Sequence, residues 1–182
     1  MKKCLGLLLL SLGLLLLSFV LIGCAKAPTN NTATTTNGSN ANEPPAINSF
    51  DVVKARPQEA TLAPGESGEA LLLIQIANGY HVNANPPSQP YLKPTELELK
   101  PAEGISVAFI TYPDPLIKNF SFSETPLKVY EGDTQLKVRL KADKKATPGK
   151  HNLSAKLRVQ ACDDKVCYAP GALDVVVPVN IK

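Results

Sequence analysis

The chain has 182 residues, with 19 basic and 16 acidic side chains and a formal net charge of +3. This balance argues against a strongly basic nucleic-acid-binding protein, and no acidic block suggests a metal-storing tail. The sequence also shows no Ser/His/Asp arrangement, paired carboxylates or phosphate-cradling glycine loop. Composition therefore excludes no fold, and the sequence motifs give no support to several common classes of enzyme.

The first 24 residues are typical of an export signal. Lys2 and Lys3 precede a mostly apolar run that ends at Leu21-Ile22-Gly23-Cys24. This ending resembles the lipobox of bacterial lipoproteins, which implies a signal peptide over residues 1–23 and lipidation of Cys24. The apolar run alone would also fit an uncleaved membrane anchor. Both alternatives place the rest of the chain outside the cytoplasm, anchored to a membrane, on the periplasmic side or at the cell surface.

Residues 24–45 contain almost nothing that could be buried, because Asn, Thr, Ala and Pro dominate them. We therefore expect a flexible linker that follows the lipidated cysteine. Residues 46–182 are enough for one compact domain with its own hydrophobic core.

Within this domain, apolar residues recur at every second position. Such alternation predicts strands with one buried face. The predicted core-facing positions, in chain order, are Ala70, Leu72, Ile74 and Ile76; Leu97 and Leu99; Ile105, Val107 and Phe109; Leu136, Val138 and Leu140; Leu153, Ala155, Leu157, Val159 and Ala161; and Leu173, Val175, Val177, Val179 and Ile181.

Turn residues separate these segments, as in Asn78-Gly79 and Pro148-Gly149, and no long stretch has a helical period. Seven to nine short strands with frequent turns predict an all-β fold, an antiparallel β-sandwich of the immunoglobulin type. The chain has no Trp and no widely spaced cysteine pair within the domain, so the antibody signature itself is absent.

Two cysteines remain available for chemistry, because Cys4 would leave with the signal peptide and Cys24 would carry lipid. Cys162 and Cys167 bracket the polar loop of residues 163–166, and we expect them to face each other across a hairpin, within reach of a disulfide. Simple continuation of the preceding strand places the Cys162 sulfur on the polar face beside Gln160, unless a bulge inverts it.

Three interpretations of this pair remain open at this point. It could be a redox couple, or an inert structural disulfide in a lipoprotein that serves as a binding or scaffolding module. Closing so short a loop would stabilise the fold by only about 2 kcal/mol, which favours a functional role. A zinc site that adds His81 and His151 to the two cysteines is a third hypothesis.

Three segments of the domain form a recognisable set: Gln160-Ala161-Cys162-Asp163-Asp164 with Cys167 and Pro170, Gly79-Tyr80-His81-Val82-Asn83, and Val129-Tyr130-Glu131-Gly132. With these segments, the sequence resembles the amino-terminal periplasmic domain of the thiol:disulfide interchange protein DsbD. The resemblance implies an immunoglobulin-like sandwich in which Cys162 and Cys167 relay electrons between thioredoxin-fold proteins through transient mixed disulfides, with no bound cofactor or metal. Family analogy favours Cys167 as the first point of attack.

The resemblance also implies a loop that caps the cysteines, here around Phe120 and Phe122, without deciding which ring is the cap. Asp163 and Asp164 should raise the pKa of the Cys162 thiol, while Lys165 should oppose them. The same two aspartates would also be ordinary as turn residues, and the two phenylalanines as core or rim aromatics.

Two differences from the family bear on the partners. Well-studied members have aromatic residues at the positions of His81 and Asn83, and a different spacing between the cysteines. Full-length DsbD also has an electron-transferring membrane domain and a thioredoxin domain. Neither is found among the residues up to Lys182, so we expect the electron donor to be another protein.

Overall fold

The computed structural model describes residues 47–182, and within them every regular element is a strand. The predicted signal peptide, the Cys24 lipidation site and the linker lie outside the described residues. The strands are β1 (Val53–Pro57), β2 (Ala60–Leu62), β3 (Ser67–Ile76), β4 (His81–Asn83), β5 (Glu96–Leu99), β6 (Ile105–Thr111), β7 (Leu116–Lys118), β8 (Leu127–Tyr130), β9 (Asp133–Ala142), β10 (Gly149–Val159), β11 (Ala161–Cys162) and β12 (Gly171–Ile181). In this part of the chain, no helix is long and apolar enough to cross a membrane.

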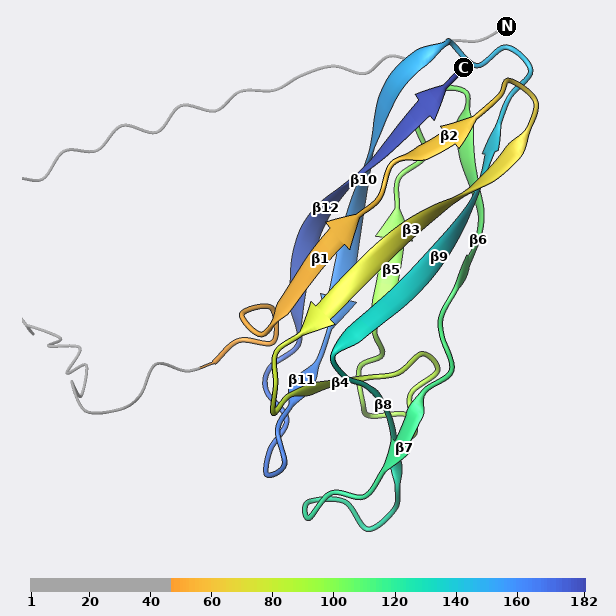
Figure 1. Ribbon diagram of the computed structural model, residues 1–182. Helices are drawn as coiled ribbons and strands as arrows, with labels where there is room; N and C mark the ends of the chain where they lie inside the picture. Colours follow the sequence, from red (N-terminus) through yellow and green to blue (C-terminus); the bar gives the residue numbers. More distant parts are fainter. Residues whose placement is uncertain (1–46) are drawn as a thin grey trace, which may run out of the picture. The chain divides into compact units, whose positions relative to one another are not determined.

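Two four-stranded sheets pack face to face around the main core (Figure 1). One has the strand order β1-β3-β9-β6 and the other β2-β12-β10-β5. All neighbouring strands are antiparallel except β2, which runs parallel to β12. The predicted antiparallel β-sandwich of the immunoglobulin type is therefore confirmed, with one parallel edge pair.

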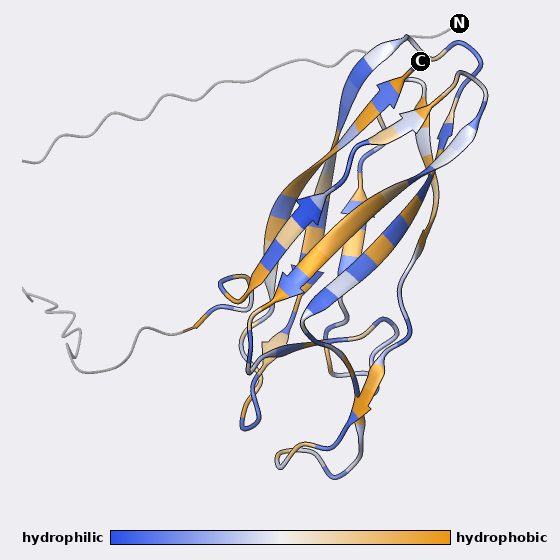
Figure 2. Ribbon diagram, in the orientation of Figure 1, coloured by the Kyte–Doolittle hydropathy of each residue, from blue (hydrophilic) through white to orange (hydrophobic). Residues whose placement is uncertain are grey.

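The alternation seen in the sequence places the core as expected. On β9, every second residue is buried, from Thr134 to Ala142. Figure 2 shows this strand banded blue and orange, whereas β3 is orange over most of its length. Strand β3 lies between β1 and β9, and its second face, with Leu71 and Leu73, is half-buried. The hydrophobic effect thus fixes the register, because a slip of one residue would expose every core side chain.

One predicted core position is wrong. Phe109 was expected to continue the buried face of Ile105 and Val107, but its side chain is 59% exposed. The pairing of β6 with β9 shifts register between Val107 and Phe109. Such an irregularity turns the following side chains to the opposite face, so Ile110 packs against the core instead.

A third, smaller sheet with the order β11-β4-β8-β7 lies at one end of the sandwich (Figure 1). Its strands have only two to four residues each, too short for a periodic pattern to reveal them. This explains why the structure has more strands among residues 47–182 than the seven to nine predicted. The sheet collects segments far apart in the sequence, and it carries the cysteine pair.

Candidate functional site: a disulfide hairpin under an aromatic cap

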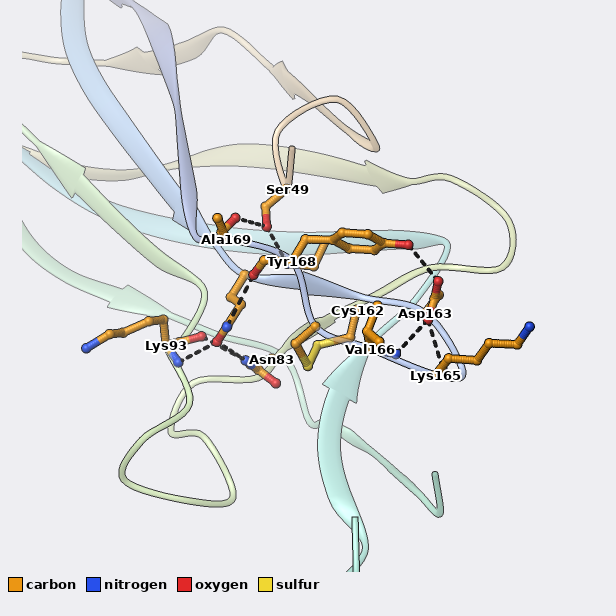
Figure 3. The surroundings of a disulfide bond; sticks show 12 residues. Ser49, Asn83, Lys93, Cys162, Asp163, Lys165, Val166, Tyr168 and Ala169 are labelled. Carbon is orange, nitrogen blue, oxygen red and sulfur yellow. Dashed lines mark hydrogen bonds between the residues drawn. A yellow bond between two sulfur atoms is a disulfide. The ribbon is translucent and has the colours of Figure 1, made fainter. Parts of the chain in front are cut away.

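The predicted hairpin is present, and its two cysteines are joined. Cys162 and Cys167 form a disulfide with a Cα–Cα distance of 3.9 Å. This is shorter than the Cα–Cα distance of about 4.5–5.5 Å that is usual for residues opposed across a hairpin, as expected from the sequence. The Asp163 amide donates to the Val166 carbonyl at 2.9 Å, and the Tyr168 amide donates to the Ala161 carbonyl at 2.8 Å. The bond therefore closes a tight turn that projects from β11 (Figure 3).

The two sulfur-bearing residues have unequal exposure. Cys162 is fully buried, whereas Cys167 is half-buried. The expectation that Cys162 lies on the same face of the strand as Gln160 agrees with the structure, because Ala161 belongs to the main core and Cys162 does not. This face is covered at Cys162, however, and the residue is not exposed. Gln160 interrupts the ladder between β10 and β11, and residues 161–162 leave the large sheet to pair with β4. The alternation itself continues through this change of partner, with Val159 and Ala161 in the main core and Cys162 on the other side.

Asp163 holds the hairpin loop in shape. Its carboxylate accepts hydrogen bonds from the amides of Lys165 at 2.7 Å and Val166 at 2.8 Å, and from the Tyr168 hydroxyl at 2.6 Å. These donors, the Tyr168 hydroxyl first, lower the pKa of Asp163. The same bond raises the pKa of Tyr168 to about 12. Asp163 therefore acts as the turn anchor that its residue type suggested.

Asp164 and Lys165 are exposed at the tip of the loop. The Asp164 carbonyl accepts a hydrogen bond from the Ser121 hydroxyl at 2.9 Å. This contact joins the cysteine hairpin to the segment between β7 and β8, which contains Phe120 and Phe122. The structure thus brings together the charged residues and the aromatic residues that the sequence singled out.

The two phenylalanines form a stack over the third sheet. The Phe120 ring lies 4.0 Å from the His81 ring between centroids, nearly parallel to it, and Phe122 stacks on Phe120 at 5.3 Å. Phe120 is buried, whereas Phe122 is 37% exposed. Phe120 is therefore the inner ring of this pair, and Phe122 the outer one. We call residues 119–125 the cap loop.

His81 lies beside the disulfide. It is the cross-strand partner of Cys162 in the β4–β11 pair, so both side chains point to the same side of the sheet. His81 is only 2% exposed, and its Nε2 has no hydrogen-bond partner. Burial lowers the pKa of its imidazole, against the opposing charges of Glu131 and Asp164.

A cavity of about 450 Å³ borders this histidine. It is lined by the turn before β4, the turn that follows β8, and charged side chains that include Lys118, Glu131 and Asp164. Lys118 and Glu131 form an ion pair at 2.6 Å across it. Gly79, in the turn, has a positive φ of 82°, which the Asn-Gly pair accommodates and which lets the chain enter β4 at His81.

Sequence reasoning missed the polar network under the hairpin. The Gln160 side chain accepts from the Asn83 amide group at 3.1 Å and from the Lys93 amide at 2.9 Å (Figure 3). The buried Ser49 hydroxyl donates to the Ala169 carbonyl at 2.6 Å and accepts from the Ala161 amide. These groups lie up to 120 residues apart in the sequence, so no local pattern reveals them.

The zinc hypothesis is wrong for this fold. His151 lies near the start of β10, where its ring contacts the Thr147 carbonyl. The eight residues from His151 to Val159 span about 26 Å of extended strand, so His151 cannot join the cysteines. Among residues 47–182, no three His, Cys, Asp or Glu side chains are grouped as metal ligands would be.

The fold and the site together define a class: a β-sandwich domain with a short-range disulfide in a hairpin at one end, beside an aromatic stack. The family model of the thiol:disulfide interchange protein DsbD, N-terminal, matches residues 51–177, and the chain belongs to this family. The resemblance inferred from the sequence is thereby confirmed. No curated protein sequence matches the chain.

Solved structures of similar fold include the N-terminal periplasmic domain of ScsB from Proteus mirabilis, at 16% identity and a TM-score of 0.50. The match covers 71% of this chain and 47% of that one, so the chain spans about half the length of its structural relative. The reduced DsbD N-terminal domain of Neisseria meningitidis matches at 19% identity and a TM-score of 0.38, covering 61% and 77% of the two chains. The same organism's complex of the DsbD and PilB N-terminal domains matches at 18% and 0.40, covering 59% and 73%.

Proposed function

We propose that this domain is an extracytoplasmic thiol:disulfide relay in which Cys162 and Cys167 accept and pass on electron pairs. Its partners are thioredoxin-fold proteins, one a donor and the other an acceptor, and it needs no cofactor. The proposal extends to lipidation of Cys24, which would hold the domain at a membrane on the outer side. Family membership supports the exchange chemistry.

The observation that carries the proposal is the unequal exposure of the two cysteines. A thiolate approaching from solvent meets Cys167, which is half-buried, whereas Cys162 is sealed. Attack at the Cys167 sulfur forms a mixed disulfide with the donor and expels the Cys162 sulfur as a thiolate. The donor's second thiol then attacks the mixed disulfide, and leaves the donor oxidised and the domain as a dithiol.

Transfer to the acceptor runs the same steps in reverse. The Cys167 thiolate attacks the acceptor's disulfide and releases one acceptor sulfur as a thiolate. Cys162 then attacks the Cys167 sulfur, releases the second acceptor thiolate, and re-forms the Cys162–Cys167 bond. Two electrons thus pass from donor to acceptor, and the domain returns to its starting state.

Single-cysteine variants test this order of attack. With Cys162→Ala, the free Cys167 thiol should capture a thioredoxin-fold protein as a mixed disulfide that non-reducing electrophoresis separates and mass spectrometry identifies. Cys167→Ala is the matched control, and it should capture little, because Cys162 is buried. Absence of capture by both variants contradicts the relay.

The reduction potential supplies an independent measurement. A relay must lie within the range of its exchange partners, roughly −120 to −270 mV for thioredoxin-fold proteins. Equilibration with glutathione or dithiothreitol buffers, followed by thiol alkylation, measures the value. A potential below about −300 mV would instead favour the structural disulfide of a binding module.

A further inference from the structure

We propose that His81 is the proton acceptor and donor of the Cys162 sulfur during exchange. This inference rests on the proposed relay and deepens it, because it names the group that allows a buried cysteine to act. The family resemblance does not supply this role, since well-studied members have an aromatic residue at this position.

The first argument is the placement of the two residues. His81 and Cys162 are directly opposed in the β4–β11 pair, which places their β-carbons about 4.5–5.5 Å apart on one side of the sheet. The Phe120 ring stacks on the imidazole at 4.0 Å and covers this side. His81 is therefore held on the same side of the sheet as the Cys162 side chain, with the Phe120 ring packed against it.

The second argument is an unmet hydrogen bond. Buried polar atoms normally have partners, but His81 Nε2 has none while Cys162 is in the disulfide. Opening the disulfide places a thiol or thiolate at Cys162, which can donate to or accept from an imidazole nitrogen. The missing partner of His81 is thus one that appears only when the disulfide opens.

The third argument is the chemistry of a buried leaving group. A thiolate expelled into an apolar site is unfavourable, because burial disfavours the charged form. The proton that neutralises Cys162 must come from a neighbour, and it must return there before Cys162 can attack again as a thiolate. His81 also lines the cavity that contains Glu131 and Asp164, so it connects the sealed sulfur to a polar space.

The charges around His81 set its protonation. Glu131, directly after β8, and Asp163 and Asp164 in the hairpin favour the imidazolium, whereas Lys118 and burial oppose it. Burial dominates, so the pKa of His81 lies below its ordinary value. The imidazole is therefore neutral near pH 7 and able to take the proton from the Cys162 thiol as the disulfide closes. When the disulfide opens, the imidazole first takes a proton from the water-accessible cavity that it lines and passes it to the expelled Cys162 thiolate.

Closure of the disulfide provides the test. Reduced protein is mixed with oxidised glutathione, and acid-quenched, alkylated samples are weighed by mass spectrometry to follow the mixed disulfide as it resolves. At pH 7, His81→Phe should slow resolution on the order of tenfold or more, the usual range for proton transfer catalysis being 10²–10⁴. Phe retains the stack on Phe120.

The pH profile separates proton transfer from packing. In the wild-type protein, the closing rate should rise with pH as His81 loses its proton. It should level off above the pKa of His81, which lies below the ordinary value of about 6.5. In His81→Phe, it should rise about tenfold per pH unit, as expected for a free thiol that must ionise. His151→Gln, which changes the only other histidine of the sequence, should behave as wild type.

An unchanged rate and pH profile in a folded His81→Phe variant overturns the inference and leaves the relay intact. If wild-type protein fails to react with glutathione and with thioredoxin-fold proteins, the relay itself is wrong. Should His81→Phe not fold, NMR titration of His81 in the wild-type protein decides. Its pKa should differ between the oxidised and reduced forms, and an identical value in both contradicts the proposal.

Discussion

At the scale of single residues, the hairpin depends on one carboxylate. Asp163 accepts three hydrogen bonds, two from loop amides and one from the Tyr168 hydroxyl. No other residue in the loop, 163–166, has a side chain bonded in this way. The conformation that presents Cys167 to solvent is therefore held by bonds within the loop and by Tyr168, whose ring also packs against the main core.

Replacement of Asp163 by Asn should lower the free energy of unfolding by about 1 kcal/mol at pH 7, because a neutral amide is a weaker acceptor for these donors. Since the pKa of Asp163 is lowered in the folded state, its stabilisation is complete above the unfolded pKa near 3.9. It is lost as the pH falls through the folded pKa. The difference between wild type and variant should therefore shrink below about pH 4, as measured by urea unfolding from pH 2.5 to 7.

Asp164→Asn is the matched control for this experiment. Asp164 lies next to Asp163, is exposed, and contributes to the loop through its backbone carbonyl, which the substitution retains. It should leave both the free energy of unfolding and its pH dependence unchanged. Equal effects of the two substitutions would mean that loop charge, rather than the hydrogen bonds, stabilises the hairpin.

At the scale of elements, the long strands could be predicted from the sequence and the site could be predicted only in part. Alternation in β9 and β10 is a local property, because a strand buries every second side chain wherever it pairs. The burial of Cys162 is not local: it follows from pairing with β4, and the neighbouring Gln160 bonds with Asn83 and Lys93 from other segments. Periodicity carries no information about such contacts.

The cap loop shows the same limit. Its two phenylalanines were expected near the cysteines from the family resemblance, but only the structure shows that Phe120 is the inner ring. From the sequence, His81 was named as a hypothetical zinc ligand and as a difference from the family, and the structure places it opposite Cys162. Its position in the matching segment Gly79-Tyr80-His81-Val82-Asn83 was the one hint in the sequence.

The cap loop should limit access to the disulfide. Phe120→Ala removes the ring that stacks on His81. Reduction of the disulfide by dithiothreitol should then accelerate on the order of tenfold, because the free energy needed to open the cap loop falls by about 1.4 kcal/mol. Phe122→Ala is the control within the same loop. Its ring is 6.4 Å from His81 and partly exposed, so the effect should be smaller.

Reduction rates are measured by alkylation of the freed thiols at several times after mixing. A rate that is the same in wild type and Phe120→Ala would contradict a gating role for the inner ring. An equal acceleration in both variants would indicate that the loop acts as a unit, with neither ring dominant.

At the scale of the whole molecule, the disulfide lies outside the main core. The core is formed by the two large sheets, whereas the hairpin belongs to the small sheet at one end (Figure 1). The bond joins residues only five apart in sequence. A link between distant strands would constrain the unfolded chain far more. The part that reacts in the proposed relay is thus separate from the main core that keeps the domain folded.

This separation predicts that the domain stays folded when the disulfide is absent. The double variant Cys162→Ala/Cys167→Ala should unfold cooperatively, with a free energy of unfolding reduced by only about 2 kcal/mol, which is small beside a typical 5–15 kcal/mol. Since the chain has no Trp, urea unfolding is best followed by far-ultraviolet circular dichroism or tyrosine fluorescence.

Leu157→Ala calibrates this measurement, because Leu157 is completely buried between the large sheets, and its truncation should cost about 2–5 kcal/mol. The double cysteine variant should lie at or below the lower end of that range. A relay requires that loss of the disulfide destabilises the fold less than loss of a core side chain, since its dithiol form must stay folded long enough to meet an acceptor. If the double variant is unfolded at 25 °C while Leu157→Ala remains native, the disulfide is a structural staple, and reduction by a partner would destroy the domain rather than load it with electrons.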